Sequence, residues 1–167
     1  MSDTGPGSAE ERALAAVTAA GIEHRVVRHG RVGSLAEAAK ARGVDERDVI
    51  KTIVVRRADE DFLFVLVPGD RTISWPKLRT LLGVSRLSMP DAETARTATG
   101  YERGTITPFG STHAWPVVAD ERVRGREISL GAGGHGVAVI VGADAAITAL
   151  AATVADVTDP EGPAASA

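Results

Sequence analysis

The sequence contains no cysteine, and this absence removes several kinds of chemistry at once. Disulfide bonds, thiolate metal sites and a cysteine nucleophile are all excluded. Aromatic residues make up only 4% of the chain, so valine, leucine, isoleucine and alanine must build the core. The longest strongly apolar run, residues 62–67, is far too short to span a lipid bilayer.

Signals for export are also lacking. Residues 1–7 have neither the basic nor the apolar region of a signal peptide, and we therefore expect a cytoplasmic protein. The 167 residues, with 44% hydrophobic and 25% charged side chains, suit one globular domain. We place this domain at residues 8–158, between flexible tails at residues 1–7 and 159–167.

The net charge of −3 argues against a protein that coats nucleic acid without specificity, and we expect neither DNA nor a membrane as a partner. Residues 51–86 differ from the rest of the chain. Seven cations minus four anions leave this segment at +3, which fits either an anion-binding patch or an ordinary solvated face. The seven cations are Lys51, Arg56, Arg57, Arg71, Lys77, Arg79 and Arg86.

Capping residues and apolar periodicity predict five helices. Ser8 and Ser34 each precede a glutamate by three residues, which is the spacing of a capping box. Ser74 can cap a helix that tolerates Pro76 in its first turn. The predicted helices cover residues 8–20, 35–42, 75–82, about 91–97 and 143–152.

Runs of β-branched and aromatic residues predict the strands. Residues 49–57 and 62–67 flank a short polar stretch, which is the pattern of a β-hairpin. Because the helices do not form a βαβ repeat, we predict an α+β domain with a mixed, mostly antiparallel, strongly curved sheet. The other predicted strands are residues 22–27, 86–88, 115–119, 127–130, 136–141 and 154–157.

Lys51 is the one charged residue within the apolar run of residues 49–55. Strand alternation puts it on the same face as Val49, Ile53 and Val55. A cation on that face either carries a function or extends to water from an edge strand, where it prevents unwanted pairing. Both interpretations of Lys51 stay open from the strand alone.

Residues 100–110 form a loop rich in glycine and proline. Gly100, Gly104 and Gly110 allow tight turns, and Pro108 fixes one φ angle. The loop lacks the glycine spacing of a dinucleotide-binding turn and the Gly-Lys-Ser/Thr of a P-loop. It could present backbone N–H and C=O groups to a small polar ligand, or it could simply connect two elements.

Two further candidates lie at the ends of predicted strands. The glycine-rich residues 131–136 could let a ligand approach the backbone near Gly133, with His135 binding a phosphate or a hydroxyl. The same stretch could equally be a bulged hairpin turn. Asp120 ends another apolar strand, where a carboxylate fits a site residue and a turn residue equally well.

The sequence indicates neither a metal site nor a Ser-His-Asp catalytic triad. His24, His29, His113 and His135 form no metal-binding pair at helical spacing, and no carboxylate completes a ligand pattern beside them. The Gly-x-Ser-x-Gly motif of many serine hydrolases is absent. We therefore expect no metal and no other cofactor.

Taken in order, several segments resemble the YbaK family of aminoacyl-tRNA editing domains, which includes free-standing deacylases and the editing insertion of bacterial prolyl-tRNA synthetases. The resemblance spans about residues 13–158. It is carried by residues 49–53, 66–70, Lys77, Leu78, Leu82, Gly83, 99–101, Gly104, Ile106, Pro108, Gly110, Asp120 and the glycine turn that ends at Gly136.

This resemblance implies a partly barrel-like sheet surrounded by helices. It also implies trans-editing, the hydrolysis of the ester between a wrong amino acid and the terminal adenosine of a tRNA. The family's signature lysine corresponds to Lys51, and its substrate-shaping loop corresponds to residues 100–110. The expected substrate-binding residues are Gly100, Tyr101, Gly104, Thr105, Ile106, Thr107, Pro108, Gly110, Asp120, Gly133 and His135. The implied partners are aminoacyl-tRNA and a prolyl-tRNA synthetase.

Two positions depart from many relatives. Thr105 stands where they have a second glycine, and Thr107 stands where they have serine. Because these threonines add methyl and hydroxyl groups near the expected pocket, the amino acid that is removed does not transfer from a relative.

An aminoacyl ester is already activated, so an enzyme must chiefly position water and stabilise the oxyanion. We expect Lys51 to anchor the terminal phosphate or the ester carbonyl, and Lys77, Arg79 and Arg86 to contact the tRNA backbone. In cysteine-specific relatives the substrate's own thiol can attack in place of water. The expected substrate is proline tRNA that carries a small wrong amino acid such as alanine, cysteine, serine or threonine.

Two alternatives stay open. The same pocket could hold an aminoacyl-adenosine group, or dock onto a synthetase, without turnover. The protein could also hydrolyse a different small ester. Cleavage of charged tRNA that depends on Lys51 would favour trans-editing over both.

Overall fold

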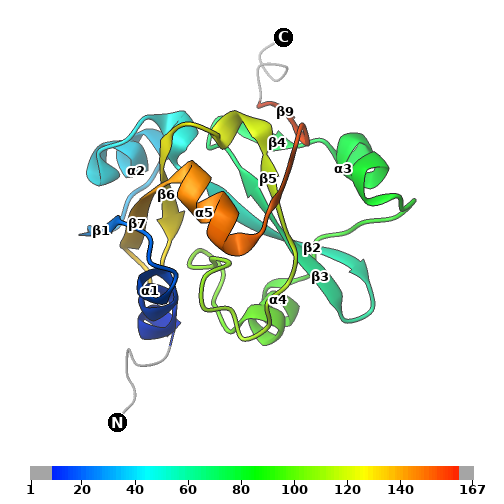
Figure 1. The fold of residues 1–167 in the computed structure, drawn as a ribbon, viewed down its shortest axis with the longest axis horizontal. Helices are drawn as coiled ribbons and strands as arrows, with labels where there is room; N and C mark the ends of the chain where they lie inside the picture. Colours follow the sequence, from blue (N-terminus) through cyan, green and yellow to red (C-terminus); the bar gives the residue numbers. More distant parts are fainter. Residues whose placement is uncertain (1–8, 162–167) are drawn as a thin grey trace.

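A computed structural model describes residues 9–161 of the chain. Figure 1 shows short helices arranged around three small sheets. The elements are α1 (Ala9–Ala19), β1 (His24–Arg28), α2 (Leu35–Arg42), η1 (Glu46–Asp48), β2 (Lys51–Ala58), β3 (Asp61–Val67), β4 (Arg71–Ile73), α3 (Trp75–Leu82), α4 (Ala92–Thr99), β5 (Val117–Asp120), η2 (Glu121–Val123), β6 (Glu127–Gly131), β7 (Val137–Gly142), α5 (Ala143–Leu150), β8 (Thr153–Ala155) and β9 (Thr158–Pro160).

The sheets combine antiparallel and parallel pairs. Strands β1, β7 and β6 form an antiparallel sheet, and β4 pairs with β9 in an antiparallel ribbon. In the sheet β2–β3–β5–β8, the β2–β3 pair is antiparallel and the other two pairs are parallel. The N–H of Ile50 donates to Ser129 O at 2.9 Å, and this bond links the β1–β7–β6 sheet to the start of β2 in the β2–β3–β5–β8 sheet.

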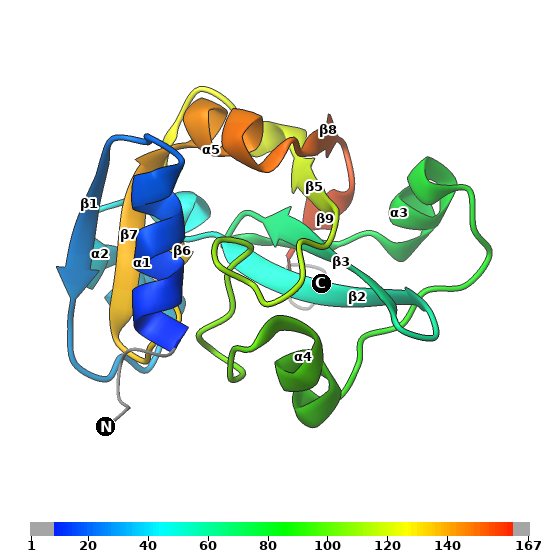
Figure 2. The same cartoon turned by 60° about the horizontal axis from the view of Figure 1, so that its bottom comes forward.

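The α+β class and the mixed, mostly antiparallel arrangement are therefore confirmed. The resemblance implied a partly barrel-like sheet, and within residues 9–161 the sheet is not closed, because β1 and β8 remain at the two ends of the strand order. Figure 2 shows the β1–β7–β6 sheet standing across the direction of β2 and β3, with α1 in front of it. Helix α4 lies below β2, while α3 lies above the hairpin.

Local capping chemistry explains the two helices whose predicted ends are confirmed to the residue, α2 and α3. Ser34 Oγ accepts a hydrogen bond from the N–H of Glu37, and Ser74 Oγ accepts one from the N–H of Lys77. Gly43 adopts a left-handed φ of 75° at the end of α2, a conformation that glycine reaches without steric cost.

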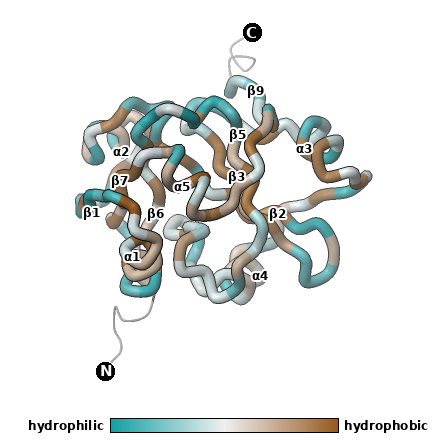
Figure 3. Tube along the Cα trace, viewed as in Figure 1, coloured by the Kyte–Doolittle hydropathy of each residue, from teal (hydrophilic) through white to brown (hydrophobic). Residues whose placement is uncertain are grey.

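Two apolar clusters pack against opposite faces of β3. Phe62, Phe64 and Leu66 belong to the larger cluster, which also contains side chains of α1, α5, β6 and β7. Leu63 and Val65 belong to the smaller cluster, which includes side chains of α3. Figure 3 shows the resulting continuous hydrophobic colour along β3, whereas the tip of the hairpin is hydrophilic. In the β2–β3–β5–β8 sheet, the hairpin therefore supplies a central strand, β3, and the edge strand beside it, β2.

Several predicted boundaries differ from the structure. Residues 86–88 form no strand, and only a single bridge joins Ser88 to Arg56. Strands β4 and β9 were not predicted, because their sequences, Arg-Thr-Ile and Thr-Asp-Pro, form no run of β-branched and aromatic residues. Since β9 reaches Pro160, the folded region extends beyond the predicted domain end at residue 158. The tail at residues 1–7 and the Ser8 cap lie outside the described residues.

Candidate functional site

A cleft of about 480 Å³ runs along the edge of β2 that is not paired with β3. The start of α4 forms its opposite wall, and the loop after α4 closes one end. The lining consists of Arg42, residues 49–54, residues 89–92, Ala95, Arg103, Gly104, Ile106 and Gly131. The walls are mainly apolar, and charged groups lie at intervals among them.

The edge of β2 inside this cleft has unpaired backbone groups. The N–H of Ile50 is bonded to Ser129, and the N–H and C=O of Arg56 are both bonded to Ser88. Because the N–H and C=O of alternate residues point to the same side of a strand, those of Thr52 and Val54 also point to this edge. Within residues 9–161 no strand pairs with them. Four hydrogen-bonding groups of β2 therefore face the cleft.

The side chain of Thr52 adds a fifth polar group. Its Oγ1 is buried and has no hydrogen-bond partner among the described residues. Alternation places Thr52 on the same sheet face as Ile50 and Val54, which belong to the larger apolar cluster. Buried hydroxyl groups are nearly always paired, so an unpaired one beside a cleft indicates a ligand position.

Lys51 lies at the rim of the cleft and points to the opposite sheet face. Its side chain is 36% exposed, and Nζ donates to the carbonyl oxygen of Arg71 at 2.5 Å. The carboxylate of Glu161 is 3.9 Å from the same nitrogen. Ile53 and Val55 pack on the smaller apolar cluster, which confirms that they share a face with Lys51. The ammonium group is thus neither buried in the core nor fully free in water.

Cations outnumber anions in the lining of the cleft. Arg42, Lys51 and Arg103 are cationic, and Asp91 is the one anion, which leaves three minus one, or +2. Burial lowers the pKa of Arg42, whose guanidinium donates to Ser129 Oγ at 2.8 Å. A hydrogen bond from the Thr94 N–H lowers the pKa of Asp91, which caps α4. The cleft therefore suits a ligand that combines apolar and anionic parts.

The loop of residues 100–110 divides into lining residues and supporting residues. Gly104 and Ile106 reach the cleft, as expected. Thr105 and Thr107 are buried, and their hydroxyl groups bond within the loop. The remaining expected residues, Gly100, Tyr101, Pro108 and Gly110, do not line the cleft either.

Tyr101 supports this loop from within. It is fully buried, and its hydroxyl donates to the carbonyl oxygen of Phe109 at 2.6 Å. Burial raises the pKa of Tyr101 to about 12. The tyrosine therefore stays neutral and ties the two halves of the loop together.

Arg12, which the sequence analysis did not single out, holds the same loop from α1. Its guanidinium donates to the carbonyl oxygens of Gly100 at 2.9 Å and Gly110 at 3.2 Å. The guanidinium carbon also lies 5.1 Å from the centre of the Tyr101 ring. No local signal could have identified this contact, because Arg12 is 88 residues from Gly100 in the sequence.

The second glycine turn contributes Gly131 to the cleft. Gly133 instead packs against α1, where an added Cβ would lie 2.6 Å from the carbonyl oxygen of Ala9. His135 is exposed and lies beside Gly104, with its Nε2 3.2 Å from Glu102 Oε1. This turn thus sits next to the loop, but Gly133 and His135 do not line the cleft.

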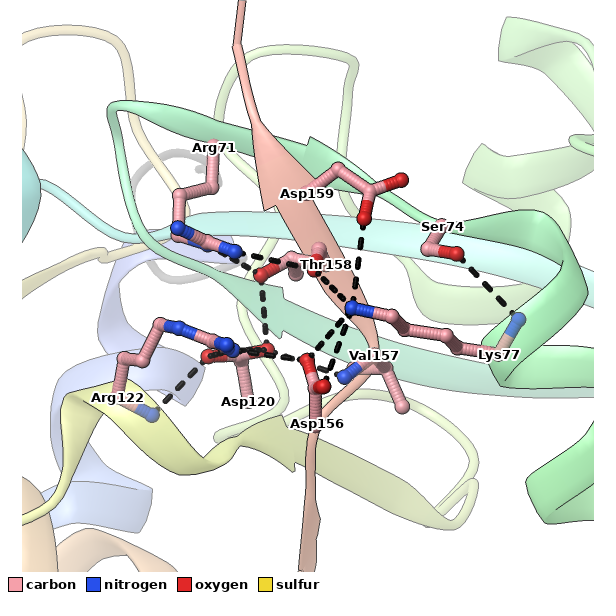
Figure 4. A network of polar contacts seen from close by, with 9 residues as sticks. All are labelled: Arg71, Ser74, Lys77, Asp120, Arg122, Asp156, Val157, Thr158 and Asp159. Carbon is pink, nitrogen blue, oxygen red and sulfur yellow. Dashed lines mark hydrogen bonds and ion pairs between the residues drawn. The ribbon is translucent and has the colours of Figure 1, made fainter.

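Asp120 lies outside the cleft, in the polar network of Figure 4. It is fully buried and accepts hydrogen bonds from the Arg122 guanidinium, the N–H of Val157 and the hydroxyl of Thr158. Arg122 also contacts Asp156. These contacts join β5 to β9, so a structural role explains the aspartate at position 120.

The three cations expected to contact tRNA are separated by the fold. The ammonium group of Lys77 belongs to the same polar network, within 3.1 Å of Asp156 and 3.3 Å of Asp159. Arg79 and Arg86 instead line a second groove with Arg56 and other residues. Lys77 is therefore occupied, whereas Arg79 and Arg86 have no carboxylate partner within residues 9–161.

Sequence reasoning missed Arg42, Thr52 and Arg103 as cleft residues. Strand alternation could have placed Thr52 on the face opposite Lys51. The extent of the unpaired edge beside Thr52 could not be predicted, because it is bounded by long-range contacts of β2 with β6 and with Ser88. In the described part of the chain, no cluster of three or more histidine and acidic side chains could hold a metal ion. Nor is any helix there long and apolar enough to cross a membrane.

Comparison with known families identifies the class of this domain. The sequence profile described as "Aminoacyl-tRNA editing domain" matches residues 29–148, which contain all the residues that line the cleft. The chain therefore belongs to the aminoacyl-tRNA editing domain family, and the resemblance noted in the sequence is confirmed.

Relatives with curated descriptions are much longer proteins. The chain is 34% identical over 79 residues to the proline–tRNA ligase of Caldicellulosiruptor saccharolyticus, a match that covers 47% of this chain and 14% of the ligase. It is 40% identical over 76 residues to the proline–tRNA ligase of Heliobacterium modesticaldum, covering 46% of this chain and 13% of the ligase. The chain thus matches only about a seventh of the length of these ligases.

Solved structures share the fold over nearly the whole chain. A protein provisionally described as a trans-editing enzyme for prolyl tRNA synthetase superposes with a TM-score of 0.83 at 24% identity, covering 96% of this chain and 100% of that chain. The hypothetical protein APE2540 gives a TM-score of 0.80 at 24% identity, covering 89% of this chain and 99% of that chain. At this level of identity the two similarities establish the fold alone.

Proposed function

We propose that this protein is a trans-editing deacylase that hydrolyses the ester of a mischarged aminoacyl-tRNA. The observation that carries the proposal is the cleft beside β2. It combines unpaired hydrogen-bonding groups of Thr52 and Val54 with a cationic rim. An aminoacylated 3′ end has matching parts: an anionic phosphate, a polar ribose and ester, and a small side chain.

In the proposed mechanism, the ester needs little activation, so positioning and charge stabilisation supply the rate. Lys51 turns from the carbonyl oxygen of Arg71 to bind the terminal phosphate or the ester carbonyl. Residues of the loop near Gly104 and Ile106 hold the ribose and aminoacyl group, with the open edge of β2 opposite them. Water then attacks the ester carbonyl, the bond to the ribose oxygen breaks, and the free amino acid leaves.

The proposed substrate is proline tRNA that carries a small wrong amino acid such as alanine, cysteine, serine or threonine. The names of the matched proline–tRNA ligases support this choice of tRNA. The mainly apolar walls, which include Val54, Ala95 and Ile106, favour a small side chain over a charged one. A prolyl-tRNA synthetase is the corresponding proposed partner.

A second candidate is a binding module that holds the aminoacylated end without turnover. One observation favours it, because the ammonium of Lys51 already has the Arg71 carbonyl and Glu161 as partners. In that case charged tRNA would bind, but its ester would persist.

The deciding experiment is deacylation of proline tRNA charged with alanine, cysteine, serine, threonine or proline. Wild type should remove one aminoacyl group selectively, and Lys51→Ala should slow that removal by about 100-fold, the effect of losing one donor to a developing oxyanion. Lys40→Ala is the matched control, since Lys40 is exposed and does not line the cleft. Full activity of a folded Lys51→Ala protein would contradict the role of Lys51, and tight binding without cleavage by wild type would support the binding module.

A further inference from the structure

A second groove, of about 530 Å³, lies between the tip of the β2–β3 hairpin and the segment after α3. Four arginines, Arg56, Arg57, Arg79 and Arg86, line it together with a single acidic residue, Asp59. Four cations minus one anion leave the lining at +3, in a chain whose net charge is −3. The groove therefore concentrates positive charge in a chain that is acidic overall.

Hydrogen bonds fix part of this charge and leave the other part available. Arg56 pairs with Asp59 at 2.8 Å, and Arg57 pairs with Asp61 at 3.1 Å. Arg79 and Arg86 have no carboxylate partner within residues 9–161. Arg86 is exposed, and Arg79 is half-buried. Two arginines are thus held in place by acidic neighbours, and two present unpaired guanidinium groups to the groove.

The groove and the cleft share a wall. Arg56 and Ser88 line the groove, and their backbones exchange two hydrogen bonds, with N···O distances of 2.7 and 3.1 Å. The next residues of the chain, 89–92, form the α4 wall of the cleft. The segment from residue 85 to residue 92 therefore lines first the groove and then the cleft. The groove and the cleft are therefore lined by consecutive stretches of the same two segments, β2 and residues 85–92.

We propose that this arginine groove binds the sugar–phosphate backbone of the RNA whose aminoacylated end occupies the cleft. The inference rests on the proposed function and adds the path of the RNA. Guanidinium groups suit phosphates because they donate two parallel hydrogen bonds and stay charged. Seven of the nine residues that line the groove are arginine, aspartate or serine, and Leu87 is the one large apolar side chain among them, whereas a protein interface has several large apolar anchors. An acidic protein segment is therefore the less favoured occupant, and the test separates the two.

The test compares two ester substrates of very different size. We would measure kcat/KM for charged tRNA and for the small ester aminoacyl-adenosine, using wild type, Arg79→Gln/Arg86→Gln and the control Arg25→Gln/Arg124→Gln. The control removes the same charge from exposed arginines that line neither the groove nor the cleft. Binding of uncharged tRNA as a function of salt concentration completes the experiment.

The groove variant should lower kcat/KM for charged tRNA by about tenfold and leave aminoacyl-adenosine within about twofold of wild type. Its logarithmic salt slope for tRNA binding should become shallower by about 1.5, as expected for the loss of two phosphate contacts. The control should change neither quantity.

Equal losses for both esters would overturn the inference, since the arginines would then act through the cleft. An unchanged salt slope, or an equal loss in the control, would overturn it as well and leave an acidic protein as the occupant to test. If wild type cleaves neither ester, the proposed function fails, and the salt dependence of tRNA binding alone still decides whether the groove binds RNA.

Discussion

Two polar regions of this molecule differ in how their groups are paired. In the network around Asp120, carboxylates, cations and hydroxyls from β4, α3, β5, η2, β9 and the segment between β8 and β9 satisfy one another (Figure 4). In the cleft beside β2, the Thr52 hydroxyl has no partner among residues 9–161, and no strand of that region pairs with the backbone edge next to it. Both regions lie against apolar clusters.

The difference distinguishes polar groups that stabilise the fold from polar groups that are available to bind a ligand. An unpaired buried polar group lowers the stability of the fold, so we expect one only where another interaction, such as ligand binding, offsets that loss. The paired network holds β9 and η2 onto the fold. The unpaired groups of β2 are instead positioned by contacts on either side, through Ile50 at one end and Arg56 at the other.

Breaking the paired region should give the largest effect. Asp120→Asn places an amide N–H₂ among the donors of Arg122, Val157 and Thr158, so we expect a loss of about 2–4 kcal/mol in the free energy of unfolding. Urea denaturation at neutral pH measures it. The exposed neighbour Glu121→Gln should change stability by less than about 0.5 kcal/mol. A stable Asp120→Asn protein that has lost activity would reverse the assignment and make Asp120 a site residue.

The loop beside the cleft offers an intermediate effect with a pH signature. Tyr101→Phe removes the hydroxyl that donates to the Phe109 carbonyl, which should lower stability by about 1 kcal/mol at neutral pH. The fold raises the pKa of Tyr101 from 10.0 to about 12. The unfolded chain therefore ionises first, and stability that is fully present below pH 10 declines as the pH rises toward 12.

Because Tyr101 is the one tyrosine in the chain, the comparison is clean. Urea denaturation of both proteins from neutral to alkaline pH should show a smaller alkaline decline in Tyr101→Phe than in wild type. Identical alkaline declines would mean that the hydroxyl is not buried in the folded protein.

Releasing Lys51 should give the smallest effect. Glu161→Gln removes the carboxylate 3.9 Å from the ammonium group, and the side chains of both residues are partly exposed. We expect stability to change by less than about 0.5 kcal/mol and kcat/KM for charged tRNA to rise slightly, because Lys51 is freer to reach the substrate. The exposed Glu60→Gln serves as control. A fall in activity would show that Glu161 positions Lys51 rather than restrains it.

The parts of the fold with local signals were predictable. Ser34 and Gly43 determine the ends of α2, and the apolar runs of β2 and β3 on either side of a short polar stretch identify the hairpin. Strands β4 and β9 were not predictable, because neither has a pattern apart from the other. The aminoacyl-tRNA editing family was recognisable because its segments keep their order along the chain.

The site was predictable only in part. Lys51, Gly104 and Ile106 line the cleft, and their roles toward a substrate stay predictions. The partners of Asp120 come from residues 122, 157 and 158, so its pairing depends on long-range contacts that local patterns do not contain. The open edge beside Thr52 also depends on long-range contacts. It lies between two places where this side of β2 is paired, because Ile50 bonds to Ser129 of β6 and Arg56 bonds to Ser88.

The most direct test of the comparison is one substitution made in both regions. Thr52 has an unpaired hydroxyl in the cleft, whereas the hydroxyl of Thr158 accepts from Arg71 and donates to Asp120. Thr52→Val and Thr158→Val each replace a hydroxyl by a methyl group of similar size. Urea denaturation and deacylation of charged tRNA would be measured on both proteins.

We predict that Thr52→Val keeps or raises stability and lowers kcat/KM by about fivefold to tenfold, because it removes a group that serves the ligand. Thr158→Val should lose about 1–3 kcal/mol of stability with the kcat/KM of the folded protein unchanged. If Thr52→Val instead loses stability as Thr158→Val does and keeps full activity, the cleft's unpaired groups are not the ligand site and the account is contradicted.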